Sequence, residues 1–128
     1  MGLTNTGMAV LSGLAGNVDS QTAFTYLALG DGNTAFAASQ AALISEITGN
    51  GLARASATVS RQTTTQTNDT VRLLKQWTAS GSETLKEIGI FNAASSGVMG
   101  FRKVLDTERA MTNGDEYTYT YDVIFAAS

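Results

Sequence analysis

The sequence predicts a mainly β fold, an antiparallel β-sandwich with one or two short helices at its periphery. Two observations support this prediction. Several segments alternate apolar and polar residues with the period of a β-strand that has one buried face. Clusters of Gly, Asn, Ser and Asp separate these segments, and such clusters are typical of turns.

The first expected element is a short helix near the N-terminus. Three apolar residues recur there at helical spacing, namely Met8, Leu11 and Leu14. Thr4 or Asn5 can cap the start of the helix, and Gly16 can end it. Gly7 and Gly13 each cost about 1 kcal/mol of helix propensity relative to alanine. We therefore expect the helix to depend on docking against the sheet or a neighbouring chain.

A strand ended by a turn is expected next. Residues 23–29 alternate, and the sequence Gly30-Asp31-Gly32-Asn33 follows them. Asp31 and Asn33 alternate as calcium ligands do, but the other ligands of a calcium loop are absent at the required offsets. The pattern favours a structural turn in which Gly30 and Gly32 adopt positive φ angles.

Two further elements are predicted between residues 37 and 66. Apolar residues at helical spacing within residues 37–47 indicate a second short helix, closed by the sequence Gly49-Asn50-Gly51. Residues 52–66 then read as one long strand, because small apolar residues alternate with polar ones from Ala53 to Val59. An alanine-rich face buries little area, so this strand is expected to pack closely against another sheet or chain.

Three more strands follow. In residues 69–79, Val71, Leu73 and Trp77 share one face, and we expect Trp77 to be a core residue, with an interface contact as the alternative. Residues 85–91 and 98–105 form the simplest hairpin, with a four-residue loop at 94–97.

The clearest pattern is an alternating stripe of large side chains in the last strand: Tyr117, Tyr119, Tyr121, Val123 and Phe125. We expect Val123 and Phe125 in the core, and Tyr117 and Tyr119 in a contact between subunits. A stacking platform for sugar or nucleic acid is the alternative. The candidate interface residues are therefore five: Met8, Leu11, Leu14, Tyr117 and Tyr119.

Length and composition narrow the class of protein. The 128 residues are enough for one domain, residues 1–128, with a helical segment at 1–16 and the β-sandwich at 22–126. There is no His and no Cys, which excludes Ser-His-Asp and Cys-His catalysis and the usual zinc sites. We expect no enzyme activity, no cofactor and no metal. The net charge of −3 argues against nucleic acid, and no apolar run is long enough for a membrane span or signal.

Four stretches of the chain carry a resemblance to a known family: Leu3-Thr4-Asn5, Leu27 to Asn33, Glu87 to Asn92, and Gly97 to Met99. Together they resemble the N-terminal attachment domains of tailed-bacteriophage fibre proteins and related small virion proteins. This resemblance implies a structural role in the virion and no reaction. Since no membrane span and no secretion signal is visible in the sequence, we also expect synthesis in the cytoplasm of the bacterial host.

The chain also departs from the fibre pattern. It has no proline, although fibres commonly carry a proline-bearing loop after the Gly-Asp-Gly-Asn turn, and it stops at Ser128 without a shaft. We therefore expect a capsid decoration (cement) protein that binds and stabilises the lattice of the major capsid protein, as a homo-oligomer with a trimer favoured. A fibre-attachment domain or a baseplate or tail adaptor, bound to tail proteins, is the alternative. A carbohydrate-binding module that uses the tyrosine stripe is a third hypothesis.

Overall fold

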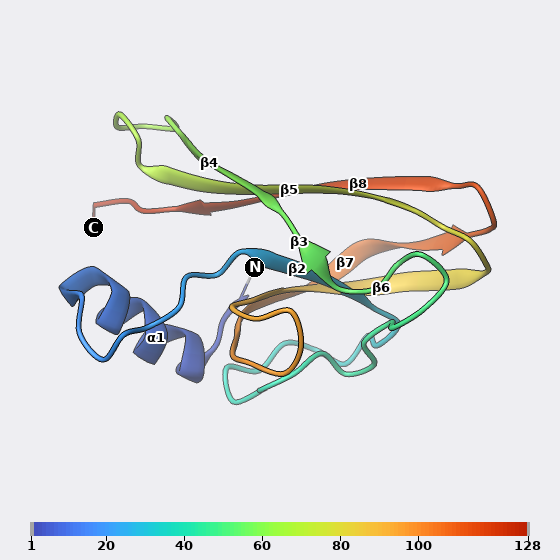
Figure 1. Ribbon diagram of the computed structural model, residues 1–128, viewed down its shortest axis with the longest axis horizontal. Helices are drawn as coiled ribbons and strands as arrows, with labels where there is room; N and C mark the ends of the chain where they lie inside the picture. The colour runs from blue at the N-terminus through green and yellow to red at the C-terminus, as the bar shows by residue number, and fades with distance from the viewer. Residues whose placement is uncertain (1, 128) are drawn as a thin grey trace.

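Two antiparallel β-sheets stack face to face in the computed structural model, which describes residues 2–127 (Figure 1). The strands are β1 (Gly2–Leu3), β2 (Tyr26–Gly30), β3 (Ala55–Ser56), β4 (Thr58–Gln62), β5 (Thr70–Thr78), β6 (Glu83–Phe91), β7 (Met99–Met111) and β8 (Glu116–Ile124). The larger sheet has the order β1-β7-β6-β2-β3, and the smaller sheet has the order β4-β5-β8. The helix α1 (Asn5–Gly16) packs against β7. The predicted mainly β sandwich is confirmed.

The core lies between the two sheets, where the alternation of each strand places its large apolar side chains. Leu73, Trp77 and Tyr121 come from the smaller sheet and are at most 3% exposed. The larger sheet faces them with residues such as Leu27 and Ile90, which are paired across β2 and β6 and fully buried. The predicted core position of Trp77 is therefore confirmed.

The outer face of the larger sheet is also covered. Ala28, Leu43, Phe91 and Met99 form a second buried cluster there, to which the segment 31–47 contributes Leu43. Because both faces of the last part of β6 are buried, residues 88–91 read as an uninterrupted run without polar side chains and not as an alternation.

Helix α1 begins as predicted and docks through its glycines. The Thr4 hydroxyl accepts a hydrogen bond from the Gly7 N–H at 2.9 Å and donates one to the Met99 carbonyl at 2.6 Å. The helix ends at Gly16, as predicted, and the residue that caps it, Asn17, adopts the left-handed conformation. Gly7 is buried, and a Cβ added there would lie 2.5 Å from the Gly100 carbonyl oxygen. Within residues 2–127, no helix is long and apolar enough to span a membrane.

We expect Gly7→Ala to destabilise the protein by about 1–3 kcal/mol, because the added methyl group meets backbone atoms that cannot rotate away. Gly16→Ala is the matched control, since its Cβ would meet only Val18 Cγ2 at an ordinary 3.6 Å. Helix propensity alone predicts that both changes stabilise the helix. Urea denaturation of the two variants separates the hypotheses, and a gain in stability for Gly7→Ala would contradict close docking.

The prediction of a second helix within residues 37–47 is wrong. This segment is irregular, because its backbone groups bond elsewhere: Ile47 N–H donates to the Leu29 carbonyl at 2.9 Å, and the Ser45 carbonyl accepts from Asp31 N–H at 2.8 Å. A single bridge between Gly30 and Glu46 continues this pairing. Tertiary hydrogen bonds along β2 therefore replace the helical ones that the apolar spacing indicated.

The prediction of one long strand over residues 52–66 is also wrong. The chain forms β3 in the larger sheet and β4 in the smaller sheet, and it crosses between them at Ala57. The Ala57 N–H donates to the Thr25 carbonyl at 2.8 Å, at the point where the chain changes sheet. A thin alanine face buries too little area to hold a long strand in one sheet.

The β6–β7 hairpin is confirmed, but β7 runs to Met111, beyond the predicted end at Leu105. The extension pairs with the first half of β6, where Glu83 faces Met111 and Leu85 faces Arg109. A bulge lies between Leu85 and Glu87, and it interrupts the alternation from which the strand end was predicted.

Asp69 holds the loop between β4 and β5. Its carboxylate accepts hydrogen bonds of 2.8 Å from the backbone N–H groups of Gln66, Thr64 and Thr65, and these bonds hold the pKa of Asp69 well below its ordinary value. A depressed folded-state pKa contributes stability above the unfolded pKa of about 3.9, and this stability is lost as the pH falls toward the folded pKa.

We therefore expect the free energy of unfolding of Asp69→Asn to fall less steeply than that of the unmodified protein between about pH 4 and pH 2. Asp106→Asn is the control, because it makes the same chemical change at a side chain that is 91% exposed. Chemical denaturation at several pH values measures both slopes. Identical acid slopes for Asp69→Asn and the unmodified chain would contradict this assignment.

Candidate functional site

Two of the four stretches that carry the family resemblance, Leu27 to Asn33 and Glu87 to Asn92, meet in space around one buried carboxylate. Glu87 in β6 lies opposite Gly30 at the end of β2. Its side chain is fully buried and accepts four hydrogen bonds, from the N–H groups of Gly32, Ile44 and Ser45 and from Arg102 Nε, at distances of 2.8–3.0 Å. We call Glu87 and Arg102 the carboxylate anchor. It ties the irregular segment 31–47 to the larger sheet.

The anchor explains the glycines at the end of β2. Gly30 and Gly32 do not adopt positive φ, so the predicted reason for them is wrong. Both are buried, and a Cβ on Gly30 would lie 2.5 Å from Glu87 Oε2. Glycine is required because the carboxylate occupies the space that a side chain would need.

The other two residues of the predicted turn are exposed and make few contacts. Asp31 lies at a bend and forms an ion pair with Lys86 at 3.2 Å, and Asn33 is exposed. Among residues 2–127 there is no group of three or more acidic, His or Cys side chains that could hold a metal ion. The segment is a bend built over the carboxylate anchor.

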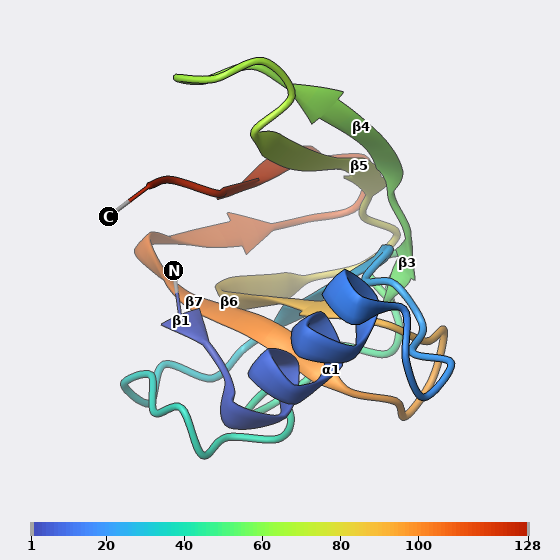
Figure 2. The same ribbon diagram turned by 90° about the vertical axis from the view of Figure 1, so that its left-hand side faces the viewer.

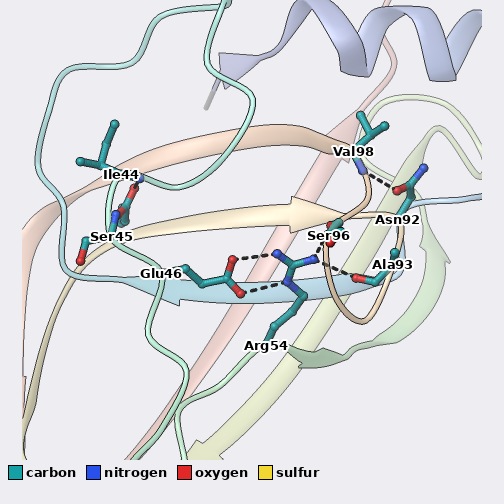
Figure 3. Close-up of polar contacts among 9 residues, drawn as sticks. Ile44, Ser45, Glu46, Arg54, Asn92, Ala93, Ser96 and Val98 are labelled. Atoms are coloured by element: carbon teal, nitrogen blue, oxygen red, sulfur yellow. Dashed lines mark hydrogen bonds and ion pairs between the residues drawn. The ribbon is translucent and has the colours of Figure 1, made fainter.

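A second anchor fixes the loop between β6 and β7 (Figure 3). The Arg54 guanidinium lies 3.6 Å from the Phe91 ring centroid and forms a two-pronged ion pair with Glu46. It also donates to the carbonyl oxygens of Ala93 and Ser96 at 3.1 and 2.8 Å. The Asn92 side chain accepts from the Val98 N–H at 2.8 Å. These motifs therefore hold the loops in place.

An apolar mouth lies at the end of the sandwich where α1 and the last residues of β8 come together. Figure 2 shows this end of the backbone, with α1 toward the viewer. A cavity of about 170 Å³ opens there between the two sheets. Six residues define the apolar mouth: Leu11, Leu14, Phe24, Val59, Val123 and Phe125. Val59 and Phe125 are 44% and 56% exposed, which is unusual for large apolar side chains gathered at one opening.

The expectation that the end of the tyrosine stripe lies in the core is not met. Phe125 is exposed and not in the core, and Val123 is only half-buried. The alternation does point Phe125 inward, but the space opposite it is the open cavity and not a strand of the larger sheet. A bond of 2.9 Å from Phe125 N–H to the Asp69 carbonyl fixes the backbone at this position.

The five predicted interface residues do not form one surface. Leu11 and Leu14 line the mouth, whereas Met8 is 49% exposed and lies outside its lining. Tyr117 and Tyr119 are half-buried near the opposite end of β8, with their rings stacked 6.1 Å apart. Burial raises the pKa of the Tyr117 hydroxyl, and Tyr119 adds to this effect.

Four residues of the mouth were not predicted as interface residues: Val123 and Phe125, which were assigned to the core, and Val59 and Phe24. The alternation in residues 52–66 placed Val59 on an apolar face but did not show that the chain would change sheet before it. Phe24 precedes β2 and packs edge-on against Phe101 with ring centroids 6.0 Å apart. A local pattern could not have assigned it to an opening between two sheets.

Comparison with known proteins identifies a family for this chain. The family model described as Podophage GP4 fiber I protein gp80 matches residues 6–124, which include nearly the whole of both sheets. No curated protein and no solved structure matches this chain. The match covers most of the chain, and it agrees with the resemblance to phage fibre proteins that the sequence motifs carry. The chain belongs to the Podophage GP4 fiber I protein gp80 family and is a phage structural protein of the tail-fibre type.

Proposed function

We propose that this chain is a tail-fibre attachment or tail adaptor domain that binds a neighbouring virion protein through the apolar mouth. The family match supports a fibre protein, and a fibre protein associates with other proteins of the virion. The two anchors described above use their charged side chains to hold loops in place. The proposal therefore concerns attachment and not a reaction.

The observation that carries the proposal is the exposure of Phe125 and Val59 at the rim of an apolar cavity. Burying a large apolar side chain is worth about 1.5–3 kcal/mol, so exposing two of them together at an opening favours a partner that covers them. The rim is also held by backbone hydrogen bonds, because Phe125 is bonded to Asp69 and Val59 lies in the β4–β5 ladder. A preformed surface of this kind costs little ordering on binding.

Capsid decoration, which the sequence favoured, stays a prediction, as does the homo-trimer. The family description names a fibre protein, so it supports the tail location at least as well. The two locations differ in copy number. A decoration protein follows the major capsid protein in abundance, whereas a tail protein is present in few copies per particle.

Phage that carry Phe125→Asp or Ile124→Asp test the proposal. Ile124 is the matched control, because it is 49% exposed, adjacent in sequence and on the opposite face of the sheet. An interface anchor contributes about 2 kcal/mol or more. We therefore expect Phe125→Asp to reduce the protein in purified virions by at least about tenfold, with Ile124→Asp close to the unmodified level.

Quantitative mass spectrometry of purified particles, and of separated tails and capsids, gives the amount and the location together. Recovery in the tail fraction in few copies supports attachment or adaptor function. Recovery in the capsid fraction, in proportion to the major capsid protein, would establish decoration in its place. Equal incorporation of the two variants would show that the mouth is not the attachment surface.

A further inference from the structure

We infer that the apolar mouth is a socket for one uncharged aromatic side chain, of the size of phenylalanine, supplied by a partner protein of the virion. This inference rests on the proposed function, because it names the chemistry of the partner at the same surface. The cavity of about 170 Å³ is close in size to the ~150 Å³ apolar cavity that stays dry and binds benzene in an engineered protein. The space therefore suits a single ring and not a bulkier group.

The residues that line the cavity determine which kind of side chain can bind in it. Among the residues that the structure describes, no charged side chain lines the cavity, and Thr25 is the only polar residue there. The Thr25 backbone groups are already bonded, N–H to the Phe91 carbonyl and carbonyl to the Ala57 N–H. A charged or strongly polar occupant would lose its hydration and would find only the Thr25 hydroxyl as a partner, which costs several kcal/mol. The occupant must therefore be apolar.

Aromatic walls favour a ring over an aliphatic chain. Phe24 and Phe101 both line the cavity and already meet edge to face, with an interplanar angle of 81°. Phe125 also lines the cavity, and 56% of its surface is exposed. A third ring placed among them can adopt the offset or edge-on geometries that aromatic pairs prefer.

Benzene is the probe, and the isolated full-length protein is the sample. We expect saturable chemical-shift changes in methyl NMR spectra, confined to residues of the mouth such as Leu11, Leu14 and Val59. Ala23→Phe should abolish these shifts, because Ala23 is exposed in the lining and its new ring can fill the cavity without crowding the core. Leu74→Phe, on the outer face of the smaller sheet, is the control and should leave the shifts unchanged.

The same two variants are then incorporated into phage. Loss of Ala23→Phe from virions, with Leu74→Phe retained, supports a partner side chain in the cavity. Absence of benzene-induced shifts in the unmodified protein would overturn the inference of an aromatic socket. The proposed function would still stand in that case if Phe125→Asp prevented incorporation into virions and Ile124→Asp did not. Normal incorporation of Ala23→Phe would also overturn the socket.

A second copy of this chain is the other possible occupant, and sedimentation distinguishes it. A concentration-dependent dimer of the isolated protein that Ala23→Phe dissociates would show that the cavity is filled by another copy. That result would overturn the assignment to a different virion protein. A monomer at all concentrations, together with benzene binding, supports it.

Discussion

Replacing Glu87 with leucine is expected to lower the free energy of unfolding by about 3–5 kcal/mol, because it breaks a fully buried ion pair by removing one partner. Arg102 would then keep its charge in the interior without a counter-ion. One of its terminal nitrogens, Nη2, is already buried without a hydrogen-bond partner among the described residues. Leucine offers no acceptor to the three N–H groups that Glu87 now satisfies, and each orphaned group adds to the loss.

The surface pair Arg72–Asp122 is the matched control for this prediction. Its Nε to carboxylate distance is 2.8 Å, equal to that of the carboxylate anchor, but its side chains are 38% and 31% exposed. Solvent screens such a pair, and Asp122→Leu should therefore cost no more than about 1 kcal/mol. Urea denaturation of the two variants compares the pairs directly. Equal losses of stability in the two variants would show that burial does not make the carboxylate anchor more stabilising than the surface pair.

Amide exchange locates the effect of Glu87→Leu. Relative to the unmodified protein, we expect amide exchange in this variant to accelerate more in residues 31–47 than in β5 and β8. The reason is that the carboxylate anchor ties that segment to the larger sheet. The double variant Glu87→Leu, Arg102→Leu should recover part of the lost stability, since no uncompensated charge remains in the interior. A double variant less stable than Glu87→Leu would contradict the argument from an uncompensated charge.

Trp77→Ala is the second change with a large expected effect, a loss of about 3–5 kcal/mol. The indole is 3% exposed, packs against Tyr117 at 6.4 Å between ring centroids, and donates from Nε1 to the Ala53 carbonyl at 3.0 Å. Truncation therefore leaves a cavity between the sheets and an unpaired carbonyl near β3. Denaturant melts with an unchanged m-value would show that the loss comes from the folded state.

Phe125→Ala is the natural comparison, because the alternation alone assigned Phe125 to the core, where truncating a phenylalanine costs about 3–5 kcal/mol. Because 56% of the Phe125 surface is exposed, we expect Phe125→Ala to lower the free energy of unfolding by no more than about 1 kcal/mol. A loss for Phe125→Ala as large as that for Trp77→Ala would mean that the mouth is closed in solution. That result would also remove the basis for the attachment surface.

Local patterns determined much of this protein. The Thr4 cap, the inward face of β5 with Leu73 and Trp77, and the β6–β7 hairpin all followed from residue spacing and turn residues. In each case the governing interaction lies within one element or between neighbours in sequence. Composition alone, with no His and no Cys, excluded whole classes of catalytic and metal site.

Only the tertiary structure decided the features that join distant parts of the chain. The helical spacing in residues 37–47 could not show that their N–H groups would bond to Glu87, more than forty residues away. The alternation of β8 could not show that its inward face ends at an open cavity and leaves Phe125 exposed. The period of a sequence pattern predicts which way a side chain points. Whether that side chain is buried depends on the segment that lies opposite it, and packing between the two sheets determines which segment that is.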